Sequence, residues 1–101
     1  MPSTHSDASR ILGERFRQER QRLSLTQMDL AYLAGMNVAN YGKIERGVGN
    51  PNFETIVRLA GVMGVDPAVF VQGITLEQLP PTKASYTAKD YIREREQRAR
   101  P

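Results

Sequence analysis

The side chains that most often carry out catalysis or bind metal ions are scarce in this chain. Its 101 residues include no cysteine and one histidine, which excludes disulfides, thiolate nucleophiles and cysteine-based zinc sites. The histidine, His5, lies in a polar N-terminal run and is expected to be solvated. An enzyme would have to use carboxylates, lysine, hydroxyls and arginine, yet the sequence has no paired carboxylates, histidine cluster or glycine-rich phosphate loop. We therefore expect a protein that is not an enzyme and that has no cofactor or metal.

The composition is that of a small, mildly basic globular protein. Hydrophobic residues make up 40% of the chain, enough for one domain with a core. The apolar runs are too short to span a membrane, and the N-terminus lacks a basic region followed by an apolar stretch, so we expect a cytoplasmic protein without a secretory signal. The net charge of +3 permits a nucleic-acid partner without demonstrating one. Residues 1–76 carry eight basic and seven acidic residues, so a DNA-binding surface there must gather positive charge on one face.

Helix signals follow one another along the chain. Apolar residues recur at helical spacing, and no strand-like alternation appears. Side chains that cap helix N-termini precede most segments, and glycines that accept a left-handed conformation end two of them. The signals predict an all-α fold with helices over about 7–23, from Thr26 to Gly35, from Asn37 to Glu45, from Asn52 to Gly64, and from Asp66-Pro67 onward.

Each predicted helix has a set of apolar residues expected to form its apolar side. The first, second and fourth sets are Leu12, Phe16 and Leu23; Leu30, Ala31, Leu33 and Ala34; and Phe53, Ile56, Val57, Leu59, Ala60 and Met63.

The C-terminal part begins with weaker signals and a break. Pro80 and Pro81 interrupt any helix and mark a linker. Beyond them, Thr87 and Asp90 form a capping-box pair, which predicts a sixth helix from about Ala88 to Ala99. The interpretation divides the chain into an N-terminal arm (1–8), a helical body (9–75), and a linker with a charged helical tail (76–101).

The junction of the second and third helices has the pattern of a helix-turn-helix. Ala31 is the small residue needed where the two helices nearly touch, Gly35 follows four residues later, and the connecting turn is about three residues long. Five residues fall on the inward positions: Leu30, Ala34, Met36, Tyr41 and Ile44.

Over roughly Leu12 to Val71 the chain resembles the Xre-type (lambda-repressor-like) DNA-binding domain. The ordered series of motifs at the right spacing is more specific than a lone helix-turn-helix pattern. The motifs are Leu25-Thr26-Gln27, Leu30-Ala31, Gly35-Met36-Asn37, Ile44-Glu45-Arg46-Gly47, Asn50-Pro51, Leu59-Ala60 and Gly64-Val65.

The resemblance implies a five-helix domain and a sequence-specific transcriptional regulator that binds double-stranded DNA. Such a protein would act as a homodimer on a (pseudo)palindromic operator, with the third helix in the major groove. A restriction–modification controller or a small phage repressor would suit the size of the chain. The DNA-binding residues that the resemblance implies are Gln27, Asn37, Val38, Ala39, Asn40, Lys43, Arg46, Asn50 and Asn52.

Several of these residues have two interpretations. Asn37 can cap the third helix or bond DNA, and capping is favoured. Val38 and Ala39 can contact only a thymine methyl group. Lys43 can meet phosphate or guanine, or be an ordinary solvated lysine.

Four residues are expected to have structural roles or depart from the family pattern. The resemblance implies that Glu45 pairs with Arg20, or as second choice with Arg17, and so holds the first helix against the third. Gly42 stands where the family usually has serine, either to permit a close backbone approach or through drift. Tyr41 replaces an aliphatic residue and is expected in the core, with its hydroxyl reaching solvent or a phosphate.

The dimer surface and the tail carry the remaining expectations. The expected dimer residues, which can also be ordinary core, are Val65, Val69, Val71, Ile74, Leu76 and Leu79. The tail can extend the dimer interface, pack on its own domain or stay mobile, and its arginines can attract phosphate. The alternative function is an antitoxin or adaptor that binds a partner protein through residues 82–101.

Overall fold

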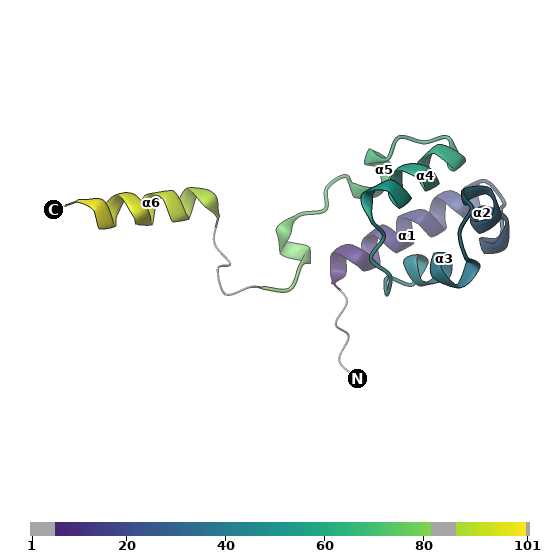
Figure 1. Cartoon of the computed structure of the whole chain (residues 1–101), viewed down its shortest axis with the longest axis horizontal. Coiled ribbons are helices and arrows are strands. Elements are labelled where there is room, and N and C mark those ends of the chain that lie inside the picture. The colour runs from purple at the N-terminus through teal and green to yellow at the C-terminus, as the bar shows by residue number, and fades with distance from the viewer. Residues whose placement is uncertain (1–5, 82–86, 101) are drawn as a thin grey trace.

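The computed structural model describes residues 6–81 and 87–100, so the predictions for His5 and for residues 82–86 of the tail lie outside the described residues. In these two ranges every regular element is helical (Figure 1), which confirms the predicted all-α fold with a helical C-terminal extension. None of the described helices is long and apolar enough to cross a membrane. The elements are α1 (Asp7–Arg22), α2 (Gln27–Ala34), α3 (Val38–Glu45), α4 (Phe53–Met63), α5 (Ala68–Val71), the short 3-10 helix η1 (Leu76–Gln78) and α6 (Ala88–Ala99).

Local side-chain caps set the starts of α2, α3 and α4. Thr26 accepts a hydrogen bond from the Asp29 backbone, and the Asp29 carboxylate accepts one from the Thr26 backbone, which completes a capping box at α2. Asn52 caps α4 by accepting from the Thr55 backbone at 2.8 Å. Gly35 ends α2 with a φ of +66°, a conformation that favours glycine. The predicted boundaries of these helices are confirmed.

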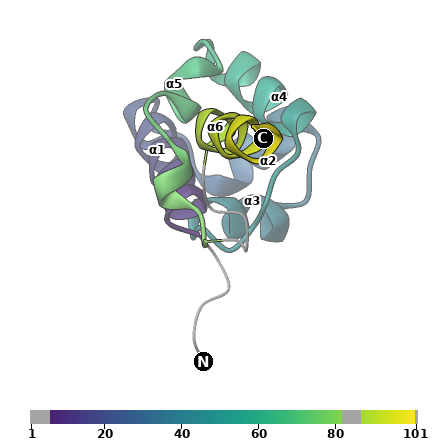
Figure 2. The same ribbon diagram turned by 90° about the vertical axis from the view of Figure 1, so that its left-hand side faces the viewer.

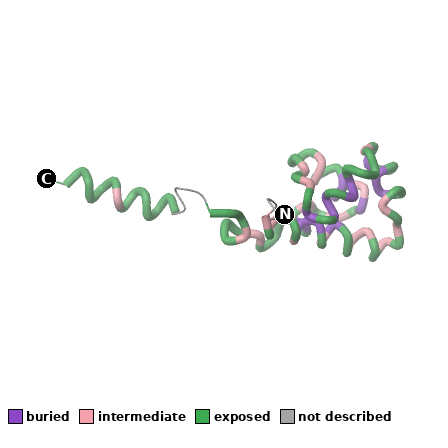
Figure 3. Tube along the Cα trace, turned by 90° about the horizontal axis from the view of Figure 1, so that it is seen from below, coloured by how far each residue is buried: buried purple, intermediate pink, exposed green. Residues whose placement is uncertain are grey.

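The core lies where α1 to α5 converge. Figure 3 shows the buried residues concentrated in this bundle, whereas α6 is exposed along its length apart from the half-buried Glu94. Phe16 of α1 stacks on Phe70 of α5 with ring centroids 4.1 Å apart, an arrangement that adds to the stabilisation from area burial. The fully buried large side chains are Tyr41, Phe16, Phe70, Leu30 and Leu59.

Three residues assigned to apolar helix faces are exposed, so their predicted place was wrong. Leu33 is 54% exposed, Val57 40% and Phe53 75%. In α2 and α4 the buried residues stand at positions i, i+1 and i+4, which cover a narrow arc of the helix. Leu33 and Val57 fall outside that arc, and Phe53 lies in the first turn of α4.

Two contacts fix the positions of α3 and α5 on α1. At Gly13 the helix α1 meets the end of α3 so closely that a Cβ atom would lie 2.2 Å from the Ile44 carbonyl oxygen. Arg15 donates to the carbonyl oxygens of Phe70 at 3.1 Å and Gln72 at 2.6 Å. These bonds satisfy carbonyls at the C-terminal end of α5, which the helix itself leaves unpaired.

The last helix, α6, lies apart from the bundle along the long axis of the molecule (Figure 1) and stands in front of the bundle in the end-on view of Figure 2. A capping box of Thr87 and Asp90 begins it, and an ion pair joins Glu94 to Arg98 one turn later. Such exposed pairs stabilise a helix by ~0.2–0.5 kcal/mol each. The predicted sixth helix is confirmed with the bounds expected for it.

Candidate nucleic-acid interface

The start of α3 is held by Asn37. Its side-chain oxygen accepts from the backbone N–H groups of Ala39 at 2.8 Å and Asn40 at 3.3 Å. The favoured interpretation of Asn37 as a cap therefore holds in the structure. Since a cap uses only the side-chain oxygen, the Asn37 amide nitrogen is still chemically able to donate to DNA.

One face of α3 is open to solvent, and the opposite face is core. Tyr41, Ile44 and Glu45 are buried against the other helices. Val38 is 39% exposed. The other predicted DNA-facing residues of α3 and its C-terminus are also exposed: Ala39, Asn40, Lys43 and Arg46.

A shallow hollow lies between α3 and the loop that leads into α4. The loop folds back on α3 because the backbone N–H groups of Val48 and Gly49 both donate to the Lys43 carbonyl oxygen at 3.0 Å. Four predicted DNA-binding residues from two segments line the hollow: Asn40, Lys43, Asn50 and Asn52. Met36 and Thr55 line it too, but the sequence analysis did not assign them to the interface. The available signal was that Met36 precedes the cap Asn37 and that Thr55 follows the cap Asn52 by three residues.

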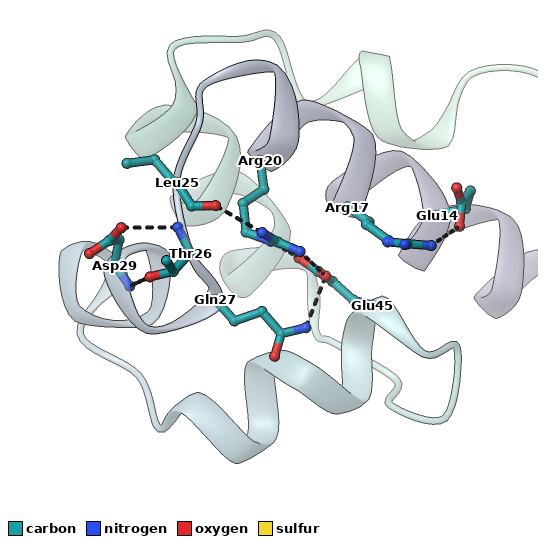
Figure 4. A network of polar contacts seen from close by, with 8 residues as sticks. All are labelled: Glu14, Arg17, Arg20, Leu25, Thr26, Gln27, Asp29 and Glu45. Carbon is teal, nitrogen blue, oxygen red and sulfur yellow. Dashed lines mark hydrogen bonds and ion pairs between the residues drawn. The ribbon is translucent and has the colours of Figure 1, made fainter.

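Behind the open face lies a polar network that joins α1, α2 and α3 (Figure 4). The Arg20 guanidinium donates to both Glu45 oxygens, from Nε at 2.6 Å and from Nη2 at 2.9 Å, and from Nη1 to the Leu25 carbonyl oxygen at 2.8 Å. The exposed fraction is 13% for the Arg20 side chain and 3% for that of Glu45. Arg17, the second choice as partner, lies beside Glu14 instead, at 3.8 Å.

Gln27 belongs to the same network. Its amide nitrogen donates to Glu45 Oε1 at 3.0 Å, and the residue is half-buried. One N–H group of the side chain that the resemblance assigns to DNA is therefore used within the protein, and the amide nitrogen has a second N–H group.

The network sets the ionisation of Glu45. Burial alone would raise the pKa of its carboxyl group, but the hydrogen bonds from Arg20 and Gln27, together with the nearby Tyr41 hydroxyl, outweigh burial and hold the pKa below its ordinary value. The same pairing raises the pKa of Arg20. Both groups are therefore charged at neutral pH.

Tyr41 is more deeply buried than the sequence suggests. Its ring is 0% exposed, and its hydroxyl is a buried polar atom without a hydrogen bond of regular geometry. Burial raises the pKa of this hydroxyl far above its ordinary value, so the group is neutral. The expectation that the hydroxyl reaches solvent or a phosphate is wrong, because the whole side chain is buried and the hydroxyl lies near Glu45 and Arg20.

The expected dimer residues divide into two groups. Val65 and Ile74 are partly buried and pack against the core. The other four are exposed to different degrees: Val69 41%, Val71 46%, Leu76 65% and Leu79 48%. Val71, Ile74 and Leu79 line one mostly apolar hollow beside the start of α1.

This bundle, with a short turn between α2 and α3 and an open polar face on α3, defines a helix-turn-helix protein. The family model described as "Helix-turn-helix domain" matches residues 11–70. The chain belongs to this family and is lambda-repressor-like in its fold.

Known proteins of this type are similar over most of the bundle. The immunity repressor protein of Bacillus phage phi105 is 30% identical over 79 residues, which cover 78% of this chain and 54% of the relative, so the chain spans about half of that protein. The crystal structure of the restriction-modification controller protein C.AhdI from Aeromonas hydrophila is 31% identical, with a TM-score of 0.60 over 61% of this chain and 94% of that one. The P22 c2 repressor protein, solved in complex with a synthetic operator, is 26% identical, with a TM-score of 0.59 over 63% and 97%.

Proposed function

We propose that this protein is a DNA-binding transcriptional regulator that places α3 in the major groove of double-stranded DNA. The observation that carries the proposal is the exposed face of α3 together with the hollow beside it. Asn40, Lys43, Asn50 and Asn52 from two segments surround that hollow, and amide and ammonium groups of this kind donate hydrogen bonds to phosphates and base edges. The similarity to an immunity repressor and to a repressor solved with its operator supports the same function.

The side chains of α3 and those of the loop into α4 have different roles in this proposal. Val38 and Ala39 occupy the first turn of α3, where the family faces the bases, and they can distinguish bases only by contact with a thymine methyl group. Lys43 and Arg46 supply the cations: Lys43 binds phosphate or guanine, and Arg46 binds the DNA backbone. Asn50 and Asn52 hold the DNA backbone near the start of α4. The interface therefore uses more phosphate contacts than base contacts, and phosphate contacts position the protein on DNA.

We propose that two copies bind together. A single α3 reads only a few base pairs, so affinity and specificity require two half-sites about 34 Å apart, one turn of the double helix. The exposed side chains of Val69, Val71, Leu76 and Leu79 supply an apolar surface for the second copy.

Selection of bound sequences from random double-stranded DNA tests the proposal. We expect enrichment of one motif with two inverted half-sites, with centres about 10 base pairs apart. Failure to enrich any sequence would contradict sequence-specific binding, and enrichment of a single asymmetric site would contradict the dimer.

A further inference from the structure

We infer that Gly42 and Gln27 position the Arg46 guanidinium for its contact with a DNA phosphate. The inference rests on the proposed function and deepens it, because it explains how one cation of the interface is held in place. The glycine that departs from the family pattern would then be a positioning residue that acts through Arg46.

The space above Gly42 is occupied by two side chains from different helices. A Cβ atom at position 42 would lie 3.1 Å from Arg46 Nη1 and 3.3 Å from Gln27 Oε1. Arg46 follows Gly42 by one turn of helix, and long helical side chains lean towards the N-terminal turn. The guanidinium thus lies in the space that the missing side chain leaves open, beside the Gln27 amide.

The orientation of the Gln27 amide is fixed by chemistry. A carboxylate only accepts hydrogen bonds, so the amide group 3.0 Å from Glu45 Oε1 must be the nitrogen. The carbonyl oxygen is then directed away from Glu45, as Figure 4 shows, and faces the space over Gly42. A guanidinium only donates, so the acceptor that Gln27 presents there matches Arg46.

The arrangement gives a reason for a glycine in the interior of a short helix. Glycine lowers helix stability relative to alanine, so its presence here is a cost to α3. A guanidinium already held near its bound position loses less side-chain freedom on binding phosphate. We infer that this gain in DNA binding offsets the cost to the helix.

The test replaces Gly42 by alanine and compares it with a matched variant. Gly61 is an exposed glycine in the interior of α4, and a Cβ atom there meets nothing within 4 Å. Gly61→Ala is expected to raise Tm by about 4 °C through helix propensity, and Gly42→Ala to raise it by less, because the Arg46 and Gln27 side chains must move to admit the new Cβ atom. Only Gly42→Ala is expected to weaken binding, by about threefold to tenfold, to a 20-base-pair random-sequence duplex at low salt.

Repeating Gly42→Ala in the Arg46→Ala protein separates two explanations of a binding loss. Either Gly42 acts by positioning Arg46, or the DNA itself comes close to Gly42. If Gly42 acts through Arg46, Gly42→Ala changes the affinity of the Arg46→Ala protein by less than about twofold. A loss as large as in the wild-type background would overturn the inference, and so would unchanged binding by the Gly42→Ala single variant. Wild-type protein that binds neither this duplex nor any selected sequence would overturn the proposed function as well, so the two failures are distinguishable.

Discussion

Replacing Glu45 by alanine should strongly destabilise the bundle. The carboxylate is almost fully buried and accepts two hydrogen bonds from Arg20 and one from Gln27. Removing one partner of a buried ion pair costs about 3–5 kcal/mol, because the other charge remains buried without its counter-ion. Arg20 keeps its bond to the Leu25 carbonyl oxygen and is 13% exposed. We therefore expect a loss near the lower end, about 3 kcal/mol of the free energy of unfolding.

Urea unfolding followed by circular dichroism measures this loss, and Glu14→Ala is the matched control. Glu14 pairs with Arg17 on the same helix at 3.8 Å, but both side chains are about half exposed, so the control should lose less than about 0.5 kcal/mol. A Glu45→Ala protein as stable as the control would refute the structural role of the pair.

A double variant tests the physical reason for the effect. If the unpaired buried charge is the cause, then replacing both Arg20 and Glu45 by methionine should cost less than the sum of the two single replacements. Strictly additive losses would contradict this reasoning, since they would mean that the two side chains act independently.

Three further predictions follow from the same geometry. Lys43→Ala should weaken DNA binding and reduce the slope of log K against log salt by about 0.9, with Tm unchanged; an unchanged salt slope would remove Lys43 from the interface. Folding lowers the pKa of Glu45 below 4.5, so the ionised carboxylate stabilises the fold above that pH, and this stabilisation is lost as the pH falls through the folded-state pKa. Wild type should therefore lose more stability on acidification than Glu45→Gln. Parallel losses of the two proteins in urea titrations would contradict the lowered pKa of Glu45. Tyr41→Phe should leave the free energy of unfolding unchanged or raise it by about 1 kcal/mol, since it removes a buried hydroxyl without a regular hydrogen bond; a loss of more than about 1 kcal/mol would show that the hydroxyl supports the network.

Local features of the fold were predictable because their physical causes are close in sequence. The capping box at α2 involves residues three apart, Thr26 and Asp29, and the cap of α4 is Asn52 itself. The pair of Arg20 and Glu45 is separated by 25 positions, and only the family resemblance suggested it.

Features that depend on the packing of distant segments were not predictable. Nothing in the sequence shows that Arg15 bonds the end of α5, or that Gly13 admits the backbone of α3. The use of Gln27 by Glu45 also depends on how closely α2 and α3 approach. Helical periodicity placed Leu33 and Phe53 on apolar faces, but it gives no information on how far the core extends along each helix.

Site-directed photocrosslinking tests most directly whether α3 reads the DNA. A benzophenone side chain would replace Val38, which is 39% exposed, and in a second protein it would replace Gly61 in α4. On a selected operator, we expect crosslinks from position 38 at two base positions symmetric about the centre of the site, and none from position 61. Equal crosslinking from both positions, or crosslinks from position 61 alone, would contradict the placement of α3 in the major groove.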